Sequence, residues 1–92
     1  MSDDVVVAAE VCRAVRDRAV SITAAELVRA LKQAGITKQD STLRKNAVTY
    51  LKRLEKLGFG QFTRGAGTRL PGASEEEAIA YASRLEFFGE IP

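Results

Sequence analysis

Polar side chains recur at helical spacing along residues 41–57, and their types suit contact with a polyanion. They are Thr42, Lys45, Asn46, Thr49, Lys52, Arg53 and Lys56. Four of them are cations and none is an acid. An ordinary solvated helix mixes both signs and gains from pairs three or four residues apart, whereas these cations repel one another. When this helix is considered alone, a basic face that is exposed only to solvent explains the pattern as well as a polyanion-binding face does.

The net charge of +2 hides a segregation along the chain. Residues 1–12 carry −3, residues 13–69 carry +9 and residues 70–92 carry −4. A basic middle between acidic ends favours a polyanionic partner.

Several chemistries lack the residues they need. The chain has no histidine, which excludes a histidine-based triad or metal site. Cys12 is the only cysteine, so it forms no intramolecular disulfide and is expected to be a small core residue. The run Glu75–Glu77 is explained as helix-start chemistry. We therefore expect no enzyme, no metal, no other cofactor and no small-molecule effector.

A hairpin is predicted after residue 58. Residues 59–64 alternate in polarity, Gly65-Ala66-Gly67 indicates a turn, and residues 68–70 return. Arg64 and Arg69 flank this slim tip, which suits close approach to a sugar-phosphate backbone or a minor groove. A plain surface hairpin has the same pattern.

Four helices must position these residues. The first is expected over about 4–18, capped by Asp3 or Asp4, and a short strand is possible at 20–22. Thr23 and Glu26 form a capping box for the second helix, over 24–34, and Gly35 ends it. The third helix is capped by Asp40 or Ser41 and closed by Gly58, with Val48 and Leu57 among its core residues. A second capping box, Ser74 with Glu77, starts a last helix that reaches residue 88. The expected fold is mainly α with a small β-hairpin, in a single domain over 1–92.

The order of these elements resembles the winged helix-turn-helix family, with an additional C-terminal helix. The residues that carry the resemblance are Ile22-Thr23, Glu26-Leu27, Ser41-Thr42-Leu43-Arg44, Leu51, Leu54-Glu55, Gly58-Phe59 and Gly67-Thr68. The match covers roughly residues 5–70. The turn before Ser41 is longer than in a tight helix-turn-helix.

The resemblance implies that the third helix enters the major groove of double-stranded DNA. Base-reading positions would then be Ser41, Thr42, Lys45, Asn46 and Thr49. Phosphates would be bound by Lys38, Arg44, Lys52, Arg53 and Lys56, with Arg64 and Arg69 acting in the wing.

We therefore expect a small transcriptional regulator that occupies an operator sequence as a homodimer, because one helix reads only a few base pairs. Its dimer interface is expected on the helix over 74–88, at Tyr81, Leu85, Phe87 and Phe88. The acidic N-terminus and the short apolar runs predict neither a signal peptide nor a membrane span, and hence a cytoplasmic, nucleoid-associated protein. Two alternatives stay open: a winged-helix adaptor or inhibitor that binds an acidic protein, and a DNA-binding replication or partition protein.

Overall fold

The computed structural model describes residues 3–70, 72 and 74–84. These residues form four helices and a small antiparallel sheet, which confirms the expectation of a mainly helical chain with a hairpin. The elements in chain order are α1 (Asp3–Arg16), β1 (Ser21–Ile22), α2 (Ala24–Gln33), α3 (Asp40–Leu57), β2 (Gln61–Thr63), β3 (Gly67–Arg69) and α4 (Glu75–Ala82).

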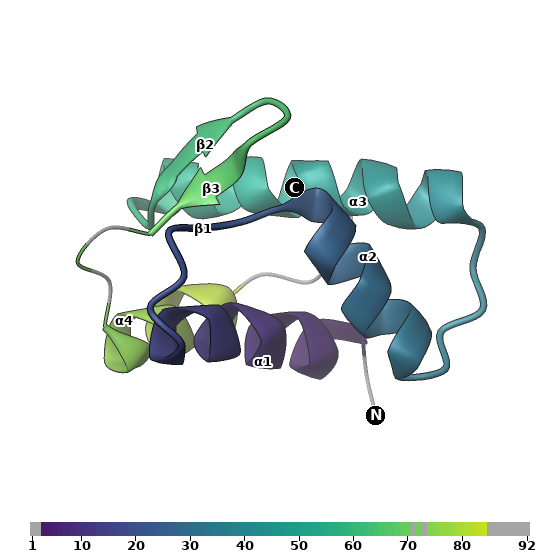
Figure 1. Ribbon diagram of the computed structural model, residues 1–92, viewed down its shortest axis with the longest axis horizontal. Coiled ribbons are helices and arrows are strands. Elements are labelled where there is room, and N and C mark those ends of the chain that lie inside the picture. Colours follow the sequence, from purple (N-terminus) through teal and green to yellow (C-terminus); the bar gives the residue numbers. More distant parts are fainter. Residues whose placement is uncertain (1–2, 71, 73, 85–92) are drawn as a thin grey trace.

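The helices lie in two levels (Figure 1). In that view α3 runs along the top, while α1 and α4 lie side by side along the bottom. Helix α2 packs against both α1 and α3 and so connects the two levels. The sheet has the order β1-β3-β2, and its hairpin rises beside α3. None of the described helices is long and apolar enough to cross a membrane.

One side of α3 supplies the centre of the core. Its Leu43, Ala47, Leu51 and Leu54 are fully buried, as the helical spacing predicts. They join apolar side chains from every other helix and from the sheet in one cluster. Those residues include Val7, Val11, Ile22, Leu27, Leu31, Phe59, Leu70 and Ala78. Burying this side turns the opposite, cationic side of α3 outward.

Both predicted cap residues, Thr23 and Ser74, cap their helices. The Thr23 hydroxyl accepts a hydrogen bond from the Glu26 backbone N–H at 3.3 Å and donates one to the Glu26 carboxylate at 3.1 Å. In the same way, the Ser74 hydroxyl accepts a bond from the Glu77 N–H at 3.2 Å. Each cap satisfies a backbone donor that has no partner inside its helix.

The predicted start of α3 is wrong. Neither Asp40 nor Ser41 caps the helix, because the N-cap is Gln39 and its side chain makes no capping bond. Asp40 lies inside the first turn, where its negative charge favours the helix dipole. Its carboxylate pairs with Lys32 of α2 at 2.6 Å. A partner from a different helix was not visible in the local sequence.

Three other expectations need correction. Helix α1 ends at Arg16, two residues before the predicted end, because Arg18 adopts the left-handed conformation with φ +56°. The predicted core positions of Val48 and Leu57 are also wrong, because Val48 is only half-buried and Leu57 is 38% exposed. Helix α4 ends at Ala82, and residues 85–88 of the predicted helix lie outside the described residues.

A buried hydrogen bond ties α3 to the end of α4. The Tyr50 hydroxyl donates to the Ala82 carbonyl oxygen at 3.0 Å. Ala82 is in the last turn of α4, where carbonyl groups lack helical partners. Burial raises the pKa of Tyr50 above the usual tyrosine value.

The substitution Tyr50→Phe should therefore lower the free energy of unfolding at pH 7 by about 1 kcal/mol, since it removes one buried hydrogen bond. It should also flatten the loss of stability at alkaline pH. A phenol with a raised pKa in the folded state contributes its full stability below the unfolded pKa of about 10 and loses it as the pH rises further.

Urea unfolding at pH 7 and between pH 9 and 11 checks both effects. Tyr81→Phe is the control, because it removes the other tyrosine hydroxyl and leaves the Tyr50–Ala82 bond intact. If the free energy of unfolding falls as steeply above pH 9 in Tyr50→Phe as in the wild type, the buried phenol is not the source of this fall.

Candidate functional site

Two adjoining open hollows lie along the exposed side of α3. The first has a volume of about 650 Å³ and is lined by Asp40, Ser41, Arg44, Lys45, Val48, Thr49 and Lys52. The second has a volume of about 430 Å³ and is lined by Thr23, Ala24, Ala25, Arg44, Val48, Lys52, Phe62, Arg64, Gly65 and Gly67. The two share Arg44, Val48 and Lys52 and so adjoin, and we call them together the α3 groove.

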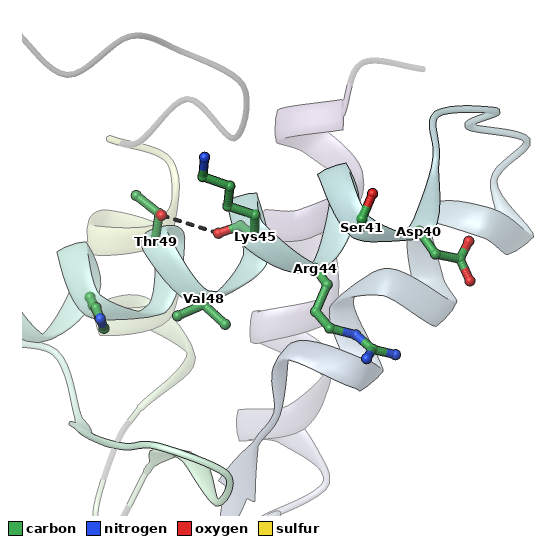
Figure 2. A pocket seen from close by; sticks show the side chains of 7 residues that line it. Asp40, Ser41, Arg44, Lys45, Val48 and Thr49 are labelled. Carbon is green, nitrogen blue, oxygen red and sulfur yellow. Dashed lines mark hydrogen bonds between the residues drawn. The ribbon is translucent and has the colours of Figure 1, made fainter.

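The α3 groove combines three elements that are separate in the sequence. The first hollow is lined by α3 alone, whereas α3, the start of α2 and the hairpin all line the second. Figure 2 shows Arg44 and Val48 projecting on one side of α3, while Lys45 and Thr49 project on the other. Thr49 donates its hydroxyl hydrogen to the Lys45 carbonyl at 3.1 Å, which holds its side chain against the helix.

The α3 groove carries a strong excess of positive charge. Arg44, Lys45, Lys52 and Arg64 line it, against a single acid among the described lining residues, Asp40. The charge of Asp40 is compensated by Lys32, which lies outside the lining. Within the described part of the chain, none of the four cations forms a salt bridge. Their charges therefore remain available to an external anion.

The hairpin is held against α3 through its edge strand. The Glu55 carboxylate of α3 accepts a hydrogen bond from the Phe62 backbone N–H of β2 at 2.8 Å. The Lys52 ammonium lies 5.9 Å from the centre of the Phe62 ring, within cation–π range. Both contacts fix the hairpin beside the cationic side of α3, and Arg64 at the hairpin tip thereby reaches the α3 groove.

A glycine brings the hairpin close to the start of α2. Gly67 has φ +77°, and a Cβ atom at this position would lie 2.1 Å from the Ile22 carbonyl oxygen and 2.7 Å from Thr23 Cα. Only a residue without a side chain allows β3 to approach β1 and the α2 cap this closely. Gly67 thus sets the width of the groove between α2 and the hairpin.

The predicted site residues divide into two sets. The α3 groove gathers Ser41, Arg44, Lys45, Thr49, Lys52 and Arg64. The remainder, which do not line it, are Lys38, Thr42, Asn46, Arg53, Lys56 and Arg69. Asn46 donates one amide hydrogen to the Thr42 carbonyl at 3.0 Å, which holds its side chain against the helix and leaves its second N–H and its carbonyl oxygen for other partners.

Arg69 lies apart from Arg64, although both flank the hairpin turn in sequence. Arg69 pairs in register with Ser21 and Gln61 at the base of the sheet. It lines a different hollow, together with Arg18 and Val20. Two arginines five positions apart on a hairpin therefore serve different surfaces.

Sequence reasoning missed two parts of the α3 groove. The start of α2, at Thr23–Ala25, was interpreted only as a cap, although its first-turn N–H groups give it a positive partial charge. Val48 was assigned to the core, yet it lines both hollows. Its position in the helical projection, one turn from both Arg44 and Lys52, was the available signal.

The remaining predicted residues are placed elsewhere. Tyr81 is half-buried, with its ring centre 5.6 Å from that of Phe59. Leu85, Phe87 and Phe88 lie outside the described residues.

Cys12 is partly buried against the core, and this burial is the main reason that the pKa of its thiol is raised. No cluster of possible metal-ligating side chains occurs among residues 3–70, 72 and 74–84.

Comparison with protein-family models, curated proteins and solved structures finds no match to this chain.

The substitution Gly67→Ala should destabilise the hairpin and displace it from α2. Gly65→Ala is the matched control, because Gly65 also has a positive φ but has nothing near its missing Cβ atom. We expect a cost of about 1 kcal/mol for Gly65→Ala from backbone strain and about 1–3 kcal/mol more for Gly67→Ala from overpacking.

Chemical denaturation of the two variants measures the difference. Equal losses of stability would show that the close approach of Gly67 to Ile22 does not constrain the fold.

Proposed function

We propose that this chain is a winged helix-turn-helix protein that binds double-stranded DNA sequence-specifically and acts as a small transcriptional regulator by occupying an operator. The observation that carries the proposal is the α3 groove. Its four cations come from a helix and from a hairpin tip, and its single acid among the described lining residues is paired with Lys32. A surface of one sign attracts a polyanion.

The shape of the surface supports duplex DNA in particular. Helix α3 has 18 residues, which makes it about 27 Å long, and its cationic side faces outward. A major groove about 12 Å wide admits one α-helix. The hairpin beside α3 corresponds to the wing of the proposed fold, and β1 pairs with it in one sheet.

Within this arrangement the groove residues take different roles. Ser41, Lys45 and Thr49 are assigned to base edges, with Lys45 as a donor to guanine acceptors. Arg44 and Lys52 are assigned to phosphates, and so are the Ala24 and Ala25 N–H groups in the first turn of α2. Arg64 at the hairpin tip is assigned to the backbone or the minor groove.

A homodimer formed through α4 completes the proposal, since one recognition helix contacts too few base pairs for a specific operator. An exposed apolar side chain on α4 favours this placement: Ile79 is 55% exposed. A dimer contact through α4 would cover this side chain.

Binding to a labelled duplex should weaken steeply as salt rises, with a log–log slope of about −0.9 for each neutralised phosphate. Lys52→Ala should weaken binding to all sequences evenly and reduce the magnitude of the slope by about one phosphate contact. Fluorescence anisotropy across a salt series measures both quantities.

Arg29→Ala is the matched control, because Arg29 is an exposed cation that lines a separate hollow between α1 and α2. It should leave the slope unchanged. A flat salt response with random and with genomic DNA contradicts the proposed function, and retention of one acidic protein in place of DNA favours the adaptor alternative.

The substitution Ile79→Glu should dissociate the proposed dimer, because it buries a charge in an apolar interface. Sedimentation at micromolar concentration should show the mass fall to that of one chain. Thr37→Glu introduces the same charge in the exposed turn between α2 and α3 and should leave the mass unchanged. An unchanged mass for Ile79→Glu removes this residue from the interface.

A further inference from the structure

An aliphatic side chain lies at the middle of the cationic surface. Val48 lines both hollows of the α3 groove and is the one aliphatic residue among the described residues that line the first. Arg44 and Lys52 lie one turn before and one turn after it on the same side of α3. The apolar spot is therefore enclosed by groups that hold an anion.

The Val48 side chain lies outside the hydrophobic core cluster. Val48 is half-buried, and it does not belong to the apolar cluster that contains Leu43, Ala47 and Leu51. Figure 2 shows it projecting from α3 on the same side as Arg44. A half-buried valine among cations leaves part of its aliphatic surface open to whatever the cations bind.

Duplex DNA presents one apolar group in the major groove, which is the C5 methyl of thymine. The remaining base edges there are hydrogen-bond donors and acceptors, which valine cannot pair. An apolar contact of this kind discriminates thymine from the other bases. It also discriminates DNA from RNA, in which uracil has no such methyl.

We propose that Val48 is a specificity-determining residue that contacts a thymine methyl group, while Arg44 and Lys52 hold the flanking phosphates. This inference rests on the proposed function and names the base at one position of the bound sequence. The contact buries about one methyl group, which corresponds to about a fourfold difference in affinity.

The experiment uses the full chain and a duplex selected from a random DNA pool. Each thymine of that duplex is replaced in turn by deoxyuridine, which removes the methyl and keeps the base pair. Affinities are measured for the wild type, Val48→Ala and Val48→Ile, with thermal melting as the check of folding. Val20→Ala is the matched control, because Val20 is a 73% exposed valine outside the α3 groove.

We expect deoxyuridine to weaken wild-type binding about fourfold at one or two thymines per half-site. Val48→Ala should lose this dependence, while Val48→Ile and Val20→Ala should keep it. If deoxyuridine affects the wild type and Val48→Ala equally, or affects neither, the contact is overturned while DNA binding stands. If the pool yields no bound DNA at all, the proposed function fails and this inference fails with it.

Discussion

The burial of one side of α3 is the constraint on which the rest of the structure depends. Leu43, Ala47 and Leu51 enter a core that α1, α2, α4 and the sheet all share. Since residues three and four positions apart lie on the same side of a helix, burying these side chains forces the polar positions between them outward. The cationic surface is thus a consequence of packing, and it cannot rotate away without exposing the core.

Further contacts fix the position of the hairpin relative to α3 and to the start of α2. Glu55 accepts the Phe62 backbone N–H, which points away from the rest of the sheet at its edge strand. Gly67 permits a backbone approach that a methyl group would block. These contacts keep the hairpin in the lining of the α3 groove, and the pairing of Asp40 with Lys32 leaves that groove with little negative charge.

Much of the fold was predictable because its signals are local. The caps at Thr23 and Ser74 are predicted by short motifs, and in both the cap hydroxyl accepts the backbone N–H of the glutamate three residues later, as expected. The boundaries failed where the deciding contact was distant or unusual. Asp40 pairs with another helix instead of capping its own, and Arg18 ends α1 in a conformation that normally favours glycine.

The sequence by itself determined that α3 has an apolar and a cationic side, because helical periodicity needs no knowledge of distant contacts. Only the tertiary structure decided which cations share one groove. Arg64 joins Arg44 and Lys52, whereas Arg69 lines another hollow, because strand register and hairpin docking fix where each side chain emerges. Helical periodicity places Val48 one turn from Arg44 and Lys52, but only the docking of α2 and the hairpin makes Val48 part of the second hollow, because these elements are distant from it in the sequence.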